Sequence, residues 1–453
     1  MAAPPAAARP PPTACRAGSS RPRPGRSNGS ASSGGVRPVG SLFFPLDERL
    51  QLGTEGYSPR LLRKIVRQGG TAPSFRAAAE DLQELAEVTI SPAHVRRLCE
   101  RLGREWAARQ EQEVAAYQQG QLPRGYQAPP KVAAVMLDGG RYQVRAEDQG
   151  RGVVDAAWKE TKVACCQTLS SAEKAQDPQP EPPRKFLEPT AVARLVSTMK
   201  ARQSAGRSER PAAPRQRRAK KKRKGPKVLV KTVVATTGDK EAFGWQVAAE
   251  VHRRGLDRAE RKACVCDGSQ ALWALFELHL LASGFVAVLD FVHLLTYLYA
   301  AAGAVKGKGT AAAWVLYERW LRLAWSGEVA SLLAALRAAA RQAGEPPPDV
   351  AEDDPRRLLA DAVTYVTHNR ERMDYPRYRR LGLPIFSAPV ESTIKQVNRR
   401  IKGSEKFWLE GGAEAVLQVR AAYLSQDDRA RRLWNQPRPY TRSVGAKRLR
   451  PAA

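Results

Sequence analysis

Three aspartates follow apolar, strand-like stretches and could together bind a divalent cation. Asp138, Asp267 and Asp290 each stand at the end of such a stretch. Carboxylates at strand ends of an α/β sheet can meet in one crevice. Mg²⁺ prefers oxygen ligands and usually takes one or two carboxylates, which leaves positions for a substrate phosphate and water. The three aspartates therefore predict a cation site that could act on phosphate esters.

Turn formation is the simpler interpretation of two of these aspartates. Asp138 and Asp267 are each followed by glycine, and Asp-Gly is a common turn dipeptide. A single Asp-Gly pair would favour a turn. Three aspartates at successive strand ends favour a site.

A fourth acidic residue, Glu391, lies near the start of a predicted helix. The apolar residues of this helix recur at helical spacing and predict a buried stripe of Val390, Ile394, Val397 and Ile401. The neighbouring face carries Glu391, Lys395, Asn398, Arg399 and Lys402. In a phosphodiester enzyme this would be a metal ligand followed by DNA-binding cations. On an exposed helix it would be simple pairing of Glu391 with Lys395.

The elements that must position these residues indicate a mixed α/β sheet. Strands are predicted at 132–137, 158–169 and 227–236, followed by alternating helices and strands up to residue 289. Residues 292–382 are predicted to form a helical insertion. The stretch 280–305 is apolar, but Gly284, Asp290 and His293 interrupt it, so a strand followed by a helix is preferred over a membrane span.

Two helices before the sheet resemble a helix-turn-helix. Ser74 can cap the first, which predicts a stripe of Phe75, Ala78, Ala79, Leu82 and Leu85. Ser91 followed by Pro92 begins the second, whose apolar stripe is Val95, Leu98, Leu102 and Trp106. Its other face carries Arg96, Arg97, Arg101 and Arg104. The pair could place its second helix in a major groove; an ordinary helical hairpin with a basic face is the alternative.

The composition favours a polyanionic partner. The 75 Lys and Arg exceed the 45 Asp and Glu by 30, and dispersed cations bind nucleic acid by neutralising phosphates. A genome rich in GC codons would also enrich Arg. Residues 1–40 and 436–453 are predicted to be basic tails, the first of them disordered. A flexible insertion at about 170–226 contains a basic run that includes Arg217, Arg218, Lys220, Lys221 and Lys222.

The cysteines argue against zinc and disulfides. None of the six has a C-x-x-C partner. Cys264 and Cys266 alternate along a predicted strand, which indicates small buried residues. The N-terminus lacks the apolar segment of a secretory signal. We therefore expect a reduced, cytoplasmic setting.

Five short motifs, taken in order, resemble those of bacterial insertion-sequence DDE transposases, closest to the Kra type. They are VMLDGGR at 135–141, WKETKV at 158–163, DGS at 267–269, LDFVH at 289–293, and the segment from GLP at 382–384 to PVES at 389–392. The likeness spans about 130 to 435. Its order and spacing make it specific.

The resemblance implies an RNase H-like catalytic core at 129–291 and 383–435, interrupted by the helical insertion and preceded by the helical DNA-binding region at 41–128. Asp138, Asp267 and Glu391 would be the catalytic residues and would hold two Mg²⁺ or Mn²⁺ ions. Asp290 and His293 match a D-x-x-H pair near the active site of several such families.

The implied function is cleavage and strand transfer of double-stranded DNA, at the element's ends and at the target. The protein would act as a homodimer or larger assembly on DNA, associated with the bacterial nucleoid, with no membrane or small-molecule substrate. One alternative is a non-catalytic DNA-binding protein derived from a transposase. Another is an RNA-binding protein, which the charge allows and the Asp-Asp-Glu order disfavours.

Overall fold

The computed structural model describes residues 57–125, 128–146, 157–203, 225–403 and 405–435. Both predicted tails and the basic run near residue 220 lie outside these ranges. The five described cysteines are buried and free, as expected for small core residues.

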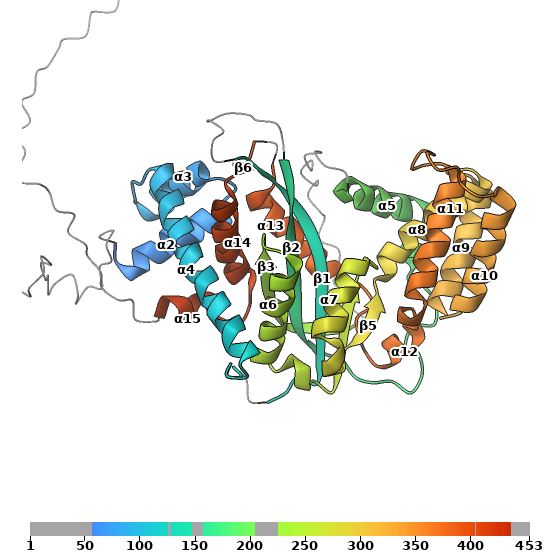
Figure 1. Ribbon diagram of the computed structural model, residues 1–453, viewed down its shortest axis with the longest axis horizontal. Coiled ribbons are helices and arrows are strands. Elements are labelled where there is room, and N and C mark those ends of the chain that lie inside the picture. The colour runs from blue at the N-terminus through green and yellow to red at the C-terminus, as the bar shows by residue number, and fades with distance from the viewer. Residues whose placement is uncertain (1–56, 126–127, 147–156, 204–224, 404, 436–453) are drawn as a thin grey trace, which may run out of the picture. The chain divides into compact units, whose positions relative to one another are not determined.

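A mixed sheet lies at the centre of the fold (Figure 1). Its strand order is β3-β2-β1-β4-β5, and β6 pairs with β1. The first three strands are antiparallel neighbours, whereas β4 and β5 run parallel to β1. The predicted α/β class with a mixed sheet is confirmed. The strands are β1 Val132–Val144, β2 Ala157–Ser170, β3 Lys227–Thr236, β4 Arg261–Cys266, β5 Val286–Leu289 and β6 Phe407–Trp408.

Side chains alternate between the two faces of the sheet along each strand. Both faces therefore carry side chains to bury, and helices cover each face. Figure 1 shows α6 (Lys240–Arg253) and α7 (Gln270–His279) in front of the strands. Thr232 of β3 donates a hydrogen bond of 2.5 Å to Glu250 of α6. The opposite face packs against α13 (Ala388–Ile401), where the Cys165 Sγ of β2 lies 3.2 Å from the Thr393 Oγ1. Asp138 follows Leu137, which lines the α6 side, so Asp138 faces α13.

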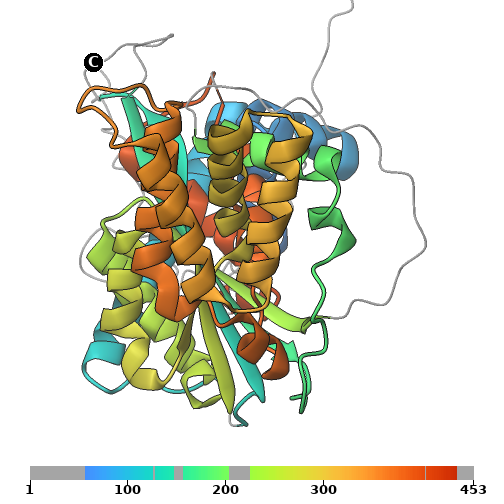
Figure 2. The same cartoon turned by 90° about the vertical axis from the view of Figure 1, so that its right-hand side faces the viewer.

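The predicted helical insertion is confirmed between β5 and α13. Figure 2 shows its helices in front of the sheet. Among the described helices, none is both long and apolar enough to cross a membrane; residues 280–305 form a strand and a helix, as predicted. The insertion comprises α8 Phe291–Lys306, α9 Ala311–Trp325, α10 Val329–Ala343, α11 Pro355–Asn369 and α12 Tyr375–Arg380. Short 3-10 turns occupy Leu256–Arg258, Leu281–Ser283 and Arg370–Arg372.

The segment after β2 folds along the helical insertion as far as residue 203. It contains the 3-10 turn η1 (Arg184–Phe186) and the helix α5 (Pro189–Gln203). The Trp325 Nε1 donates to the Gln179 carbonyl at 2.9 Å, and the Tyr317 hydroxyl donates to the Phe186 carbonyl at 3.3 Å. These contacts, together with burial of the Phe186 ring, account for structure where the sequence predicts a flexible insertion.

Within the described residues, three helices precede the sheet, and the sequence predicts two of them. They are α2 Pro59–Thr71, α3 Phe75–Ala86 and α4 Pro92–Gln118. The predicted caps are confirmed, since the side chains of Ser74 and Ser91 accept hydrogen bonds from the amides of Ala77 and His94. The apolar stripe of α4 is buried as predicted. The assignment of Leu85 to the apolar stripe of α3 is wrong, because Leu85 is 78 % exposed.

Helix α4 packs closely against α14 (Glu410–Leu424), which is followed by α15 (Arg429–Asn435). A Cβ atom at Gly103 would lie 2.0 Å from the Ala415 carbonyl oxygen. Glycine therefore permits the two helix backbones to approach. This contact joins the N-terminal helices to α14, one of the helices that cover the sheet.

Gly103→Ala should lower the free energy of unfolding by about 1–3 kcal/mol or more, because backbone atoms of α14 would have to move. Denaturant unfolding measures the change. Gly411→Ala is the matched control, since a Cβ there meets nothing within 4 Å. Equal stability of the two variants would contradict the close packing.

Candidate active site

The three aspartates stand level with one another across three neighbouring parallel strands. The β1–β4 register pairs Met136 with Val265, and the same offset takes Asp138 to Asp267. The β4–β5 register puts Asp267 and Asp290 each one residue past the last paired positions. Equivalent positions on neighbouring strands share a face of the sheet. The sheet register thus gathers residues that are far apart in the sequence.

Asp138 lies within a strand, so its predicted place at a strand end is wrong. β1 continues to Val144, because the antiparallel partner β2 continues beside it and pairs Asp138 with Val163. Turn formation therefore does not explain Asp138-Gly139. The next glycine brings α13 close to the strand, since a Cβ at Gly140 would lie 3.3 Å from the Asn398 Oδ1.

Asp267 lies in a turn that the helical insertion holds in place. The Asp267 Oδ1 accepts a hydrogen bond of 2.9 Å from the Ser269 amide. The Tyr365 hydroxyl of α11 donates to the Asp267 carbonyl at 2.6 Å. Gly268 has φ +97°, and a Cβ there would lie 2.6 Å from the Tyr365 ring. The turn thus requires glycine, both for its backbone conformation and for contact with the insertion.

Asp290 is fully buried and both its carboxylate oxygens accept hydrogen bonds. The Oδ1 accepts from the Val292 amide at 2.8 Å and so caps α8. The Oδ2 accepts from the His293 Nδ1 at 3.1 Å, from the Ser387 amide at 3.3 Å and from the Ser387 hydroxyl. Four donors therefore occupy this carboxylate.

Ser387 connects Asp290 and His293 to Glu391. These three residues, together with Asp138 and Asp267, are called the acidic cluster below. The Ser387 hydroxyl lies 3.3 Å from the Glu391 Oε1, one helical turn further along α13. Possible ligand atoms of Asp290, His293 and Glu391 all lie within 4.8 Å of one another. The predicted supporting pair and the predicted glutamate thus occur together, although the sequence separates them widely.

Burial and like charges raise the pKa of Asp138 to about 7. Burial contributes most, and the negative charges of Asp267 and Glu391 add to it, against the Gly139 amide and the His293 charge. Asp267 and Glu391 therefore both lie within electrostatic range of Asp138. A cation would relieve this repulsion.

The neighbours of His293 favour its protonated form. Burial alone would lower its pKa, but the hydrogen bond to Asp290 and the charges of Asp290, Asp267 and Asp138 raise it to about 9. The described residues whose possible ligand atoms lie within 4.8 Å of one another are thus Asp290, His293 and Glu391, and the half-buried carboxylates of Asp138 and Asp267 lie beside them.

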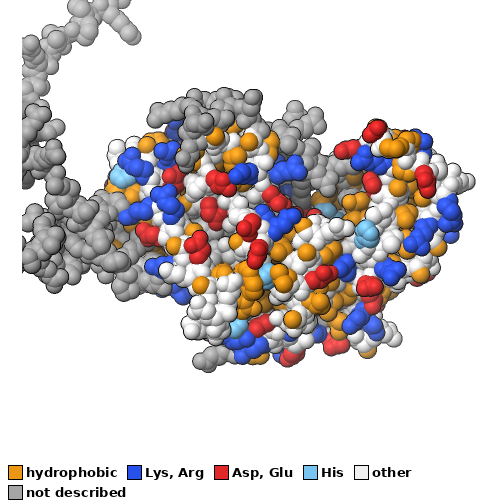
Figure 3. All heavy atoms as spheres, viewed as in Figure 1, with side chains coloured by type: hydrophobic (Ala, Val, Ile, Leu, Met, Phe, Trp, Pro, Cys, Tyr) orange, Lys and Arg blue, Asp and Glu red, His pale blue; other side chains and the backbone are white. Residues whose placement is uncertain are grey.

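The predicted DNA-binding cations are distributed over several helices. Arg96 and Arg97 are exposed on α4, and Arg101 is half-buried. On α13, Arg399 is exposed, whereas Lys395 and Lys402 are half-buried. Arg217, Arg218 and Lys220–222 lie outside the described residues. Figure 3 shows Lys and Arg interspersed with Asp and Glu on the visible face.

Sequence reasoning missed a row of exposed cations on α2, in addition to the arginines of α4. Arg60, Arg63, Lys64 and Arg67 are exposed and recur at i, i+3, i+4 and i+7, which places them on one helical face. This spacing could have revealed them. With this row, both α2 and α4 carry cations that could contact phosphates.

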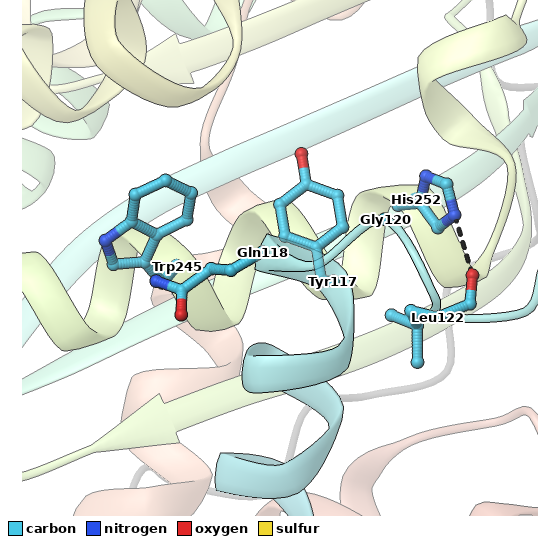
Figure 4. A pocket seen from close by; sticks show the side chains of 6 residues that line it. All are labelled: Tyr117, Gln118, Gly120, Leu122, Trp245 and His252. Carbon is cyan, nitrogen blue, oxygen red and sulfur yellow. Dashed lines mark hydrogen bonds between the residues drawn. The ribbon is translucent and has the colours of Figure 1, made fainter.

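A hollow of about 550 Å³ lies on another part of the surface (Figure 4). It is lined by Tyr117, Gln118, Gly120, Leu122, Trp245 and His252. The His252 Nε2 lies 3.0 Å from the Leu122 carbonyl. None of the acidic cluster lines this hollow, so we assign it no part in the chemistry.

Comparison with models of protein families found no match, and comparison with curated proteins found no significant match.

Asp138→Asn should make stability less dependent on pH. The folded pKa of about 7 lies above the unfolded value of about 3.9, so this group's stabilisation is present below about pH 4 and lost as pH rises to 7. The variant should remove a slope of up to about 1.4 kcal/mol per pH unit. Denaturant unfolding between pH 4 and 8 measures it. Asp349→Asn, in an exposed loop, is the control; identical profiles for wild type and Asp138→Asn would refute the crowding.

Proposed function

We propose that this protein is a DDE transposase, which cuts and joins DNA strands with divalent cations. The observation that carries the proposal is that Asp267 and Glu391 both lie close enough to Asp138 for their charges to raise its pKa, with Asp267 level with Asp138 on the neighbouring strand. They come from two neighbouring strands and a helix that begins 121 residues after Asp267. Without a shared ligand such crowding of acids is costly.

The fold supports this proposal. A strand order of β3-β2-β1-β4-β5, with two antiparallel and two parallel pairings, is compatible with an RNase H-like core. The helical insertion lies between β5 and the helix that bears Glu391. This is the arrangement that the sequence resemblance implies.

The chain's own residues would divide the work as follows. Asp138, Asp267 and Glu391 would hold the ions, since carboxylate oxygens suit Mg²⁺ and Mn²⁺. Bound ions would supply Lewis acidity and activate a water or a 3′-hydroxyl. Asp290 would orient His293 and the start of α13. The His293 imidazolium would place positive charge beside the entering phosphate.

The rival is a DNA-binding protein without catalysis, using only the basic helices α2 and α4. The acidic cluster favours the enzyme, because a purely binding surface for DNA gains nothing from buried negative charge.

Asp138→Ala, Asp267→Ala and Glu391→Ala should each reduce DNA cleavage by more than about 100-fold, since even outer-shell residues of metal sites contribute 10–100-fold. Cleavage is measured with Mg²⁺ on duplexes taken from the DNA that flanks the coding region. DNA binding should persist. Glu410→Ala, at an exposed helix start, is the control; wild-type cleavage by all three variants would refute the site.

Mg²⁺ at a hundred times its Kd should stabilise the wild-type protein by about 2.7 kcal/mol, because it binds only the folded state. Thermal unfolding with Mg²⁺ and with EDTA measures the effect. Glu391→Ala should lose most of it. If the wild-type protein binds DNA but neither Mg²⁺ nor Mn²⁺ stabilises it, the result would favour the non-catalytic rival.

A further inference from the structure

Lys185 lies beside the acidic cluster although it belongs to none of the motifs. It is part of η1, in the segment between β2 and β3. Its Nζ lies 4.5 Å from the centre of the Phe186 ring and 5.2 Å from that of Phe386. Phe386 immediately precedes Ser387, which contacts both Asp290 and Glu391.

The neighbouring structure holds this lysine in position. The Phe186 ring is buried and packs against Phe291 and Phe386, with ring centres 5.8 and 5.9 Å apart. The Tyr317 hydroxyl donates to the Phe186 carbonyl. The backbone of η1 is therefore anchored between the insertion and the start of α13, and Lys185 projects from a supported turn.

The ammonium group of Lys185 lies near the carboxylates of Asp290 and Glu391 but forms no salt bridge with either. Burial lowers its pKa, while the charges of Asp290 and Glu391 act in the opposite direction. Among the described residues it forms no salt bridge with a carboxylate. Other cations near the cluster are engaged: His293 with Asp290, and Lys231 with the Thr393 hydroxyl.

We propose that Lys185 binds a phosphate of the DNA strand that enters the active site. The inference rests on the proposed function and names a substrate contact for it. A phosphate brought to these carboxylates needs a positive group nearby to offset the repulsion between like charges, and an ammonium on an anchored turn costs little entropy to order. The ammonium group lies over the two phenyl rings, and the residue is exposed, so the charge remains accessible.

A purely structural role is the competing explanation. The cation–π contacts of Lys185 with Phe186 and Phe386 could serve only to fasten η1 to α13. Lys185→Met separates the two roles, because methionine retains an unbranched apolar chain against the rings and loses the charge.

Binding of a fluorescein-labelled duplex from the flanking DNA, measured over a range of KCl concentrations in Ca²⁺, tests the proposal. Loss of one phosphate contact should reduce the slope of log K against log[salt] by about 0.9. Lys185→Met should show this reduction and Lys185→Arg should restore the slope. Arg184→Met is the matched control, because Arg184 belongs to the same turn, is 92 % exposed and pairs with Glu188; its slope should equal that of wild type.

Nicking of supercoiled plasmid with Mn²⁺ provides the second readout, and Lys185→Met should slow it several-fold at saturating DNA. If Lys185→Met has the same slope as wild type and the wild-type protein nicks DNA, the role of Lys185 is overturned and the proposed function stands. A reduced slope in a protein that never nicks DNA supports the phosphate contact and overturns the proposed function instead.

Discussion

Repulsion among acidic side chains on one face of the sheet is the constraint on which the rest of the site depends. Asp138, Asp267 and Glu391 are half-buried, where charges interact more strongly than in water. The Gly139 amide and the His293 imidazolium offset part of this repulsion. Burial is the largest cause of the raised pKa of Asp138, about 7, and the remaining repulsion adds to it. Protonation of Asp138 therefore favours the folded state.

The helix α13 holds its position because buried polar groups fasten both of its ends. At the N-terminal end, Asp290 gathers donors from α8 and from the start of α13. Near the C-terminal end, the Arg400 Nε donates to the Gly69 carbonyl at 2.9 Å, and its guanidinium lies over the rings of Phe75 and Trp408. Removing one partner of such buried groups is costly. The N-terminal helices are therefore joined to α13, the helix that carries Glu391.

Local features of the fold could be predicted from the sequence, since they depend on neighbours along the chain. Ser74 and Ser91 cap their helices as expected, because a hydroxyl needs only the amide three residues later. Apolar periodicity predicted β3 to the residue and the general extent of the insertion. The exposure of Leu85 was missed, because periodicity identifies a face without showing how far its partner extends.

The amino-acid sequence by itself determined which acids follow apolar strands, where the helices begin, and the order of the elements. The tertiary structure decided everything that depends on pairing between distant segments. Only the register of β1 with β2 shows that Asp138 lies within a strand, and only the packing of α13 brings the Ser387 donors to Asp290. Lys185 carried no periodic signal at all, because its place beside the cluster comes from contacts with the insertion. Such contacts are set by shape and packing across the whole molecule, which no local pattern records.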